Sequence, residues 1–298
     1  MSNTPNLITQ PMIDLYDRFT HIGGTRRELL AGLARLTGGM AAASALLPLL
    51  EARAEAAPLS APDDPRLVTK TVHWDGAGDH KMAGYMTYPT GNTGDLPRAI
   101  VIHENRGLNE HTRDVARRLA LAGFVVLAPD FLAPVGGTPS VGDGATPAED
   151  VARTMIGKLD RVATVADGVA TLRWLAGQPQ GRGAAGAVGF CWGGGMVNAL
   201  AVAAGADLKA GVAYYGQAAD ANDAGKVQSK IMLHYAGLDE RINAMGPAWQ
   251  AALKAAGKTY EAHMYEGVNH AFNNDTSEAR YNKAAADLAW GRTLAWLR

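Results

Sequence analysis

Short apolar segments alternate with helical ones along most of this sequence, and this alternation constrains the fold more than any other feature. The apolar segments occupy residues 99–103, 124–129, 184–190, 210–216, 230–237 and 259–267. Segments with helical character occupy residues 111–122, 148–176, 195–205, 245–256 and 278–297. Continuous apolar strands that alternate with helices are typical of a parallel sheet buried on both faces. The pattern predicts the α/β class, with a mostly parallel central sheet and helices on both faces.

An antiparallel hairpin is predicted ahead of the parallel strands. The strand-like stretches "TKTVHW" and "MAGYMTYP" are separated by the turn-rich "DGAGDH". Before them, the proline-rich stretch "PLSAPDDP" at residues 58–65 is predicted to be a linker. These boundaries divide the chain into an N-terminal extension at 1–57, the linker, and an α/β domain at 66–298.

The extension has two interpretations. The pair Arg26-Arg27, the uncharged run at residues 36–50 and the "AEA" at residues 54–56 resemble a twin-arginine export signal, which implies a periplasmic protein. However, one helical face upstream carries four large apolar side chains: Met12, Leu15, Tyr16 and Phe19. A removable leader has no need of such a face. The alternative is a retained helical arm that packs on the domain or mediates a homodimer, in a cytoplasmic protein.

Composition excludes several classes of protein. The 28 basic and 29 acidic residues leave a net charge of −1, without a basic block for a nucleic-acid partner. The uncharged run at residues 36–50 is shorter than the ~20 residues of a membrane span. A single cysteine excludes an intrachain disulfide and a multi-thiolate zinc site.

That cysteine, Cys191, lies in the stretch "GFCWGGG" between a predicted strand and a predicted helix. Gly189 and Gly193 flank it in a G-x-C-x-G pattern, which is the nucleophile-elbow pattern with sulfur in place of oxygen. A nucleophile on such a tight turn needs neighbours with almost no side chain. The free N–H groups at the start of the following helix favour a thiolate. The alternative is a buried structural cysteine at a close-packed glycine corner.

Two later residues complete a catalytic pattern. Asp239 follows the strand at 230–237, and His270 follows the strand at 259–267. The chain order of nucleophile, acid and base is that of hydrolases with a nucleophile elbow, and each residue leaves the sheet where loops build sites. We therefore expect Cys191 as nucleophile, His270 as base and Asp239 as the group that orients the imidazole. Taken singly, Asp239 could instead cap a turn and His270 could be a surface residue.

The loop after the strand at 99–103 reads "HENRGLNEH". The backbone N–H groups of Asn105 and Trp192 are the expected oxyanion donors. Glu104 is unusual here because a carboxylate disfavours a nearby thiolate, unless its role is to receive the thiol proton. The alternative is that Glu104 forms a salt bridge to Arg106 or Arg113.

Together, "GFCWGG", "HENRGLN", "AYYG", "GLDERIN" and "GVNHAF" resemble the dienelactone hydrolase (carboxymethylenebutenolidase) family of the α/β-hydrolase fold, over roughly residues 66–298. The resemblance implies a Cys–His–Asp triad of Cys191, His270 and Asp239. It implies Glu104 as a switch that pairs with the resting thiol, and hydrolysis of small esters or lactones without a metal or organic cofactor. The N-terminal extension resembles a longer branch of the family.

The residues that bind substrate depart from the family pattern. Members bind a substrate carboxylate with two arginines, but Asn273 and Asn274 stand where the arginine after the histidine is expected. Arginine and tyrosine side chains in site-forming loops are the candidates for this contact: Arg106, Arg153, Arg241 and Tyr215.

The sequence is also compatible with two other functions. The same cysteine could attack phosphorus in a broad-specificity esterase or phosphotriester hydrolase, or the chain could be a non-catalytic module in which Cys191 senses oxidation. The spacing H-E-x5-E-H beginning at His103 does not match a zinc protease, and no glycine-rich nucleotide motif is present. We therefore expect no metal.

Overall fold

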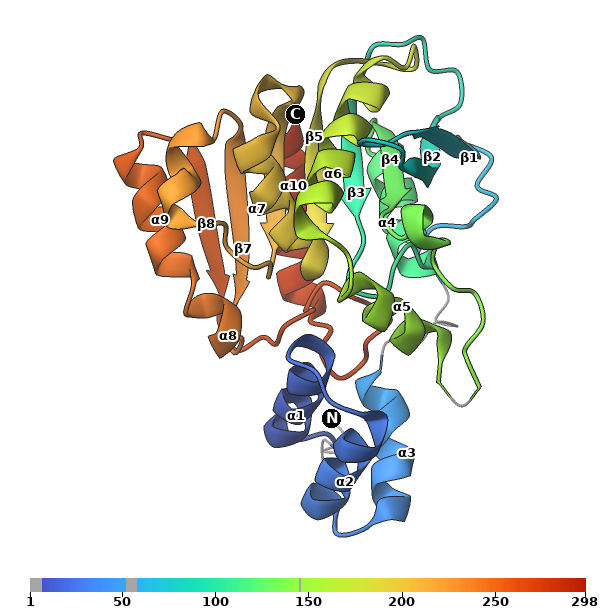
Figure 1. Ribbon diagram of the computed structural model, residues 1–298, viewed down its shortest axis with the longest axis vertical. Helices are drawn as coiled ribbons and strands as arrows, with labels where there is room; N and C mark the ends of the chain where they lie inside the picture. Colours follow the sequence, from blue (N-terminus) through green and yellow to red (C-terminus); the bar gives the residue numbers. More distant parts are fainter. Residues whose placement is uncertain (1–6, 52–57, 145) are drawn as a thin grey trace.

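The computed structural model describes residues 7–51, 58–144 and 146–298, and an eight-stranded sheet forms its centre (Figure 1). The strands are β1 (Leu67–Asp75), β2 (Lys81–Pro89), β3 (Leu96–Ile102), β4 (Val125–Asp130), β5 (Gly181–Phe190), β6 (Leu208–Tyr214), β7 (Lys230–Ala236) and β8 (Tyr260–Tyr265). Their order in the sheet is β1-β2-β4-β3-β5-β6-β7-β8. The β1–β2 and β2–β4 pairs are antiparallel and all other neighbouring pairs are parallel. The predicted α/β class, parallel sheet and N-terminal hairpin are confirmed.

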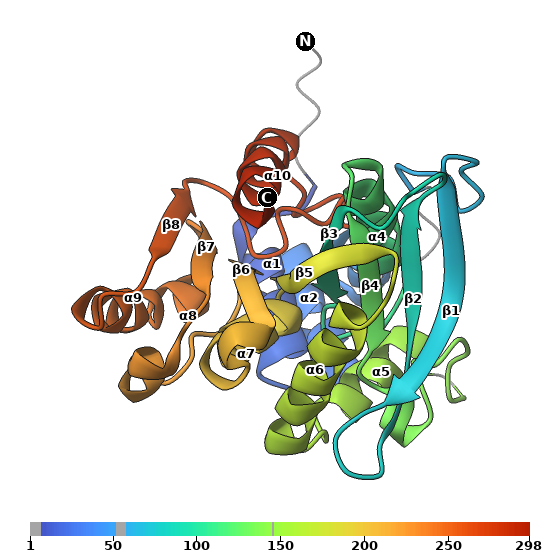
Figure 2. The same cartoon turned by 90° about the horizontal axis from the view of Figure 1, so that it is seen from above.

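Helices cover both faces of the sheet (Figure 2). On one face, α4 (Glu110–Leu121) and α10 (Lys283–Leu297) share a hydrophobic cluster with the strands. On the other face, α6 (Arg161–Ala176), α7 (Trp192–Ala203) and α9 (Gly246–Ala255) do the same. Since both faces are buried, the central strands need apolar residues at consecutive positions, which explains the uninterrupted runs in the sequence.

The predicted helical stretch 148–176 consists of two helices, α5 (Ala148–Ile156) and α6. The break has a local cause, because the carboxylate of Asp160 accepts a hydrogen bond from the N–H of Ala163 at 2.8 Å and caps α6. A short helix after β7, α8 (Glu240–Asn243), was not predicted.

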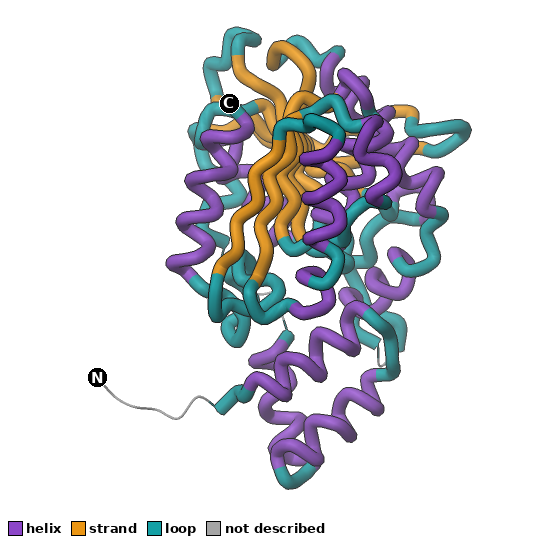
Figure 3. Tube along the Cα trace, turned by 90° about the vertical axis from the view of Figure 1, so that its left-hand side faces the viewer, coloured by secondary structure: helices purple, strands orange, loops and turns teal. Residues whose placement is uncertain are grey.

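Three helices precede the sheet: α1 (Gln10–His21), α2 (Arg26–Thr37) and α3 (Met40–Leu50). They lie beyond the edge at which the parallel strands end (Figures 1 and 3). Thr25 and Glu28 form a capping box at the start of α2, and Gly38 ends it with a φ of 82°. The helices enclose a small apolar core of their own: Ile8, Met12, Ile13, Tyr16, Phe19, Leu29, Leu33, Ala43, Leu47 and Leu50. We call residues 7–51 the N-terminal arm.

The export-signal interpretation concerns this same region, and its "AEA" stretch at 54–56 lies outside the described residues. Within the described part of the chain, no single helix has the length and apolar composition of a membrane span. Helices α2 and α3 have that length and composition only when they are counted together, and a bend of 111° separates them.

Candidate active site

Cys191 lies at the junction of β5 and α7 with φ 56° and ψ −115°, a left-handed conformation that side chains rarely adopt. Its N–H donates to the carbonyl of Tyr214 at 3.0 Å, and its carbonyl accepts from the N–H of Gly195 at 3.1 Å. The sheet and the helix thus hold the cysteine in a strained conformation, as expected of a nucleophile elbow.

Neighbouring glycines are required because backbone segments approach closely there. A Cβ on Gly189 would lie 2.1 Å from the carbonyl oxygen of Gly193. A Cβ on Gly193 would lie 2.4 Å from the carbonyl oxygen of Ile102, and one on Gly194 would lie 2.6 Å from that of Tyr214. The G-x-C-x-G-G pattern is therefore a packing requirement of the turn.

Replacing Gly193 with alanine is expected to lower the free energy of unfolding by about 3 kcal/mol, because the new methyl group overlaps backbone that cannot rotate away. Gly291→Ala in α10 is the matched control. A Cβ there meets nothing within 4 Å, and alanine favours a helix interior by about 0.5–1 kcal/mol. Urea denaturation of both variants measures the difference, and equal stabilities would contradict the packing argument.

The structure brings Asp239 and His270 together. Asp239 caps α8 just after β7, and one carboxylate oxygen accepts from the N–H of Ile242 at 3.2 Å. The other oxygen lies 2.6 Å from Nδ1 of His270, and both side chains are buried. This contact places the Nδ1 proton toward the carboxylate and directs Nε2 away from it.

A ring nitrogen of His270 lies within 4.8 Å of Sγ of Cys191, although Nε2 makes no hydrogen bond of ordinary geometry in the described residues. Burial alone would lower the pKa of His270. The negative charges of Asp239 and Cys191 outweigh it and raise the pKa to about 10. This favours the imidazolium form of His270 at neutral pH.

The raised pKa of His270 predicts a loss of stability at alkaline pH. The unfolded imidazole has a pKa of about 6.5, so the folded chain holds an extra proton above that pH. The stabilisation is complete below pH 6.5 and disappears as the pH rises through about 10. Thermal unfolding from pH 6 to 10.5 is expected to show a steeper decline for the wild type than for His270→Gln. Parallel curves would mean that His270 does not hold this proton.

Glu104 follows β3, and its carboxylate accepts a hydrogen bond from Asn274 at 3.0 Å. Its other oxygen is buried without a partner among the described residues. The alternative, a salt bridge from Glu104 to Arg106 or Arg113, is not formed. Arg106 pairs instead with Glu149, and Arg113 lies 4.0 Å from Glu110. Asn274, one of the two asparagines at the expected arginine position, therefore binds the glutamate.

The expected oxyanion donors, Asn105 and Trp192, line the same pocket as the cysteine. Trp192 is the first residue of α7, where the backbone N–H has no partner in a preceding turn. Its ring stacks on His103 with centroids 5.2 Å apart. The side chain of Asn105 donates to the carbonyl of Thr20 in the N-terminal arm at 3.0 Å.

A pocket of about 420 Å³ opens onto Cys191. Besides Cys191, five of the expected site residues contribute to its wall: Asn105, Arg153, Trp192, Tyr215 and Arg241. Arg106 does not line it, because its guanidinium is buried between Glu149 and the hydroxyl of Tyr16. Tyr214 packs elsewhere, with its hydroxyl on Thr293 at 2.7 Å.

His21, the last residue of α1, was missed in the sequence analysis. Its Nε2 lies 3.2 Å from Sγ of Cys191, and its ring meets that of His270 edge-on with centroids 4.4 Å apart. Burial and the positive charges of His270 and Arg241 hold the pKa of His21 well below its usual value, so this imidazole is neutral. The one available signal was that the amphipathic segment containing Tyr16 and Phe19 ends at this histidine.

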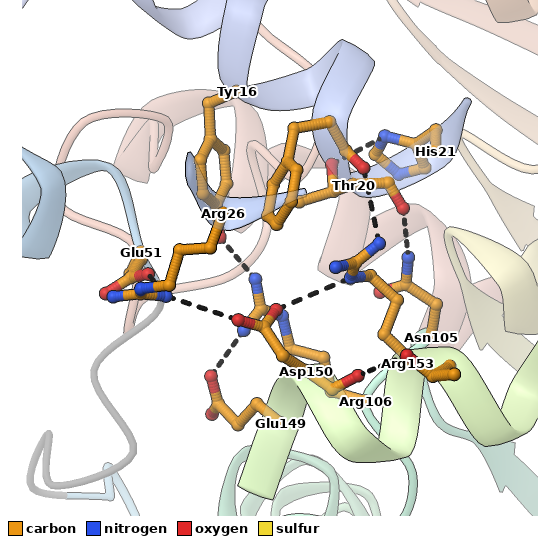
Figure 4. A network of polar contacts seen from close by, with 12 residues as sticks. Tyr16, Thr20, His21, Arg26, Glu51, Asn105, Arg106, Glu149, Asp150 and Arg153 are labelled. Carbon is orange, nitrogen blue, oxygen red and sulfur yellow. Dashed lines mark hydrogen bonds and ion pairs between the residues drawn. The ribbon is translucent and has the colours of Figure 1, made fainter. Parts of the chain in front are cut away.

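The N-terminal arm is bound to the sheet domain by a network of charged groups (Figure 4). Arg26 of α2 contacts Glu51 at 2.6 Å and Asp150 of α5 at 3.2 Å. Arg153 lies over the ring of Phe19, with 4.3 Å between the guanidinium carbon and the ring centroid. The contacts of Asp150 and Arg153 attach the arm to α5, and those of Asn105 with Thr20 and of Arg106 with Tyr16 attach it to the loop after β3.

Arg280, which follows the histidine motif in the sequence, is also engaged by the arm. It pairs with Asp17 at 3.1 Å, and its guanidinium lies 5.0 Å from the ring centroid of Tyr16. A substrate carboxylate would therefore have to displace Asp17 to reach Arg280.

The sheet order, the elbow and the acid–histidine pair after β7 and β8 define an α/β-hydrolase. A model of the dienelactone hydrolase family matches residues 82–298, and the chain belongs to that family. It is thereby classed with the carboxylic-ester hydrolases.

Relatives agree with this assignment. A protein of Escherichia coli O157:H7, provisionally named carboxymethylenebutenolidase, is 30% identical over 248 residues, which cover 80% of this chain and 89% of that protein. Among solved structures, a provisionally assigned dienelactone hydrolase from Klebsiella pneumoniae has a TM-score of 0.67 at 27% identity, covering 78% of this chain and 98% of its own. A dienelactone hydrolase-like promiscuous phosphotriesterase from metagenomic libraries has a TM-score of 0.66 at 26% identity, covering 77% and 97%.

Proposed function

We propose that this protein hydrolyses small esters or lactones through a thioester formed on Cys191. The observation that carries the proposal is the strained cysteine at the start of α7, with the Asp239–His270 pair beside it. A buried acid–histidine pair at a reactive thiol is the arrangement that nucleophilic acyl transfer requires.

The proposed reaction has two steps. The thiolate of Cys191 attacks the acyl carbon, and the N–H groups of Trp192 and Asn105 stabilise the oxyanion. The carbon–oxygen bond to the leaving group breaks, and the imidazolium of His270 gives its proton to the departing alkoxide. Water then attacks the thioester while neutral His270 takes its proton, which releases the acid and restores the thiolate–imidazolium pair.

Glu104 is proposed to pair with the resting thiol of Cys191 and to take its proton when the substrate enters the pocket. Its second carboxylate oxygen is buried and lacks a hydrogen-bond donor among the described residues, so a proton there would be accommodated. The hydrogen bond from Asn274 holds the carboxylate in the loop after β3.

Arg241 is the favoured contact for a negatively charged substrate group. It lines the pocket beside Cys191 and makes no hydrogen bond or ion pair within the described part of the chain. Arg153 lines the same pocket but is already engaged by Asp150 and by the carbonyl of Phe19, both at 3.4 Å. Tyr215 completes this wall, with its ring centroid 4.7 Å from that of His270.

Trapping the thioester tests the function. The full chain is mixed with p-nitrophenyl acetate, and a burst of nitrophenol equal to one acyl group per chain is expected, with acetate found on Cys191 by mass spectrometry. Label on any other residue, or no covalent adduct with any ester tried, would overturn the proposal.

Phosphotriester hydrolysis is the second candidate, favoured by the likeness to the promiscuous phosphotriesterase. In that reaction the same thiolate attacks phosphorus and expels an aryloxide. The ratios of kcat/KM for dienelactone, a p-nitrophenyl ester and an aryl phosphotriester rank the two functions.

The N-terminal arm is proposed to be part of the mature enzyme. It has an apolar core, its Arg26 pairs with Asp150, and its residues Thr20 and His21 line the pocket. The intact mass of the protein isolated from its own cells tests this, and a mass lacking the arm would support the export signal.

A further inference from the structure

We propose that His21, Cys191 and His270 form a binding site for a zinc ion that reversibly blocks the cysteine. The three side chains come from the N-terminal arm, the elbow and the loop after β8. One ligand atom from each lies within 4.8 Å of the other two. The zinc site goes beyond the proposed hydrolysis. Only the inhibition of catalysis by bound zinc rests on that proposed function.

The hydrogen bonds of the two histidines direct their free nitrogens at the sulfur. Nδ1 of His21 lies 2.8 Å from the carbonyl oxygen of Asp17, which can only accept, so Nδ1 carries the proton. Nδ1 of His270 is held in the same way by the carboxylate of Asp239. Both rings therefore present an Nε2 lone pair to the shared space once His270 gives up its second proton. Metal-binding histidines are typically held by such a carbonyl or carboxylate on the opposite nitrogen.

Among the described residues, one polar group in this space lacks a hydrogen-bond partner, and a second contacts the sulfur of Cys191. Nε2 of His270 is buried, with 3% of the residue exposed, and has no hydrogen bond in the described residues. Nε2 of His21 has a lone pair facing a sulfur at 3.2 Å, a contact that is favourable only if the thiol keeps its proton or a cation lies between them.

The dimensions suit a tetrahedral zinc ion. Zinc bonds of about 2.3 Å to sulfur and about 2.0–2.1 Å to nitrogen place the ligand atoms about 3.4–3.6 Å apart. The distance from His21 to the sulfur is already 3.2 Å, and the other two, bounded by 4.8 Å, require side-chain shifts of about 1 Å. The pocket that opens onto Cys191 leaves room for a water molecule as the fourth ligand.

The donor set selects among metals. One thiolate and two imidazoles favour zinc and similar transition-metal ions over magnesium or calcium, which prefer oxygen ligands. On binding, the zinc ion accepts lone pairs from the sulfur of Cys191, Nε2 of His21 and Nε2 of His270, and the one proton that Cys191 and His270 hold between them leaves to solvent. No electron is transferred, and a chelator reverses the step. The sulfur can no longer attack an acyl carbon while the zinc is bound.

Cobalt(II) serves as a spectroscopic probe for this site. Chelator-treated full-length protein is titrated with Co²⁺, and a sulfur-to-cobalt charge-transfer band that saturates at one ion per chain is expected. Addition of Zn²⁺ should abolish the band and yield the zinc affinity by competition. His21→Ala should weaken binding more than about 100-fold, since even residues behind the ligands contribute 10- to 100-fold. The control His73→Ala, on an exposed position of β1, should bind as the wild type does.

Two results would overturn the site: no saturable cobalt band in the wild type, or a band in His21→Ala with an affinity within about threefold of wild type. If His21→Ala does not fold, His21→Gln takes its place in the cobalt titration. Circular dichroism verifies that this variant folds as the wild type does. In parallel, Zn²⁺ should inhibit ester hydrolysis and EDTA should restore it. If no ester is hydrolysed, the proposed function fails, while the cobalt spectra still decide the metal site.

Discussion

Replacing Cys191 with alanine is expected to reduce kcat/KM for an activated ester by about 10⁴-fold or more, because loss of a nucleophile leaves only binding and the oxyanion donors. The fold should survive, since alanine is smaller than cysteine and the strained turn is held by backbone contacts with Tyr214 and Gly195. Stopped-flow or steady-state release of p-nitrophenol measures the effect, with circular dichroism to verify folding.

Cys191→Ser provides a second comparison, because it keeps the size of the side chain but replaces the thiolate with a weak nucleophile. It should lose the burst of acylation as well. If the alanine variant keeps ester hydrolysis within about tenfold of wild type, Cys191 is not the nucleophile, and the proposed thioester is wrong.

Asp239→Asn is expected to lower kcat by about 10²- to 10⁴-fold without unfolding the chain. The asparagine amide does not favour the imidazole with its proton on Nδ1, and it cannot support the imidazolium by charge. The variant should lose part of the stabilisation that comes from the raised pKa of His270, because Asp239 is one of the two negative charges that raise it. The cap of α8 should persist because asparagine caps helices about as well as aspartate, so the N–H of Ile242 keeps an acceptor.

Asp160→Asn is the matched control, since Asp160 caps α6 in the same way but has no histidine partner in the described residues. It should leave the activity unchanged. The pH–rate profile of Asp239→Asn should also lose the alkaline limb near the His270 pKa of about 10. An unchanged rate and profile would show that Asp239 acts only as a helix cap.

Most of the sheet domain could be predicted because its signals are local. The uninterrupted apolar run in β5, the glycines around Cys191 and the positions of Asp239 and His270 after their strands follow from requirements that neighbouring residues impose. The family resemblance depends on the same motifs, and the family match at 82–298 agrees with it. Domain boundaries, substrate contacts and the activity of the site residues stay predictions.

The surroundings of the site could not be predicted in the same way. Arg106 was expected to bind substrate, yet the structure buries it against Tyr16, a residue 90 positions away. Nothing near Arg106 in the sequence indicates that partner, because the contact depends on where the N-terminal arm docks.

The sequence alone determined the class of fold, the glycine corner and the order of the acid and the histidine, because each is specified by hydrophobic periodicity or steric need within a short segment. Tertiary structure alone decided that His21 meets Cys191 and His270, and that the arm forms one wall of the pocket. These contacts join segments 170 and more residues apart, so their geometry depends on the packing of whole helices and leaves no pattern in the sequence around any one residue.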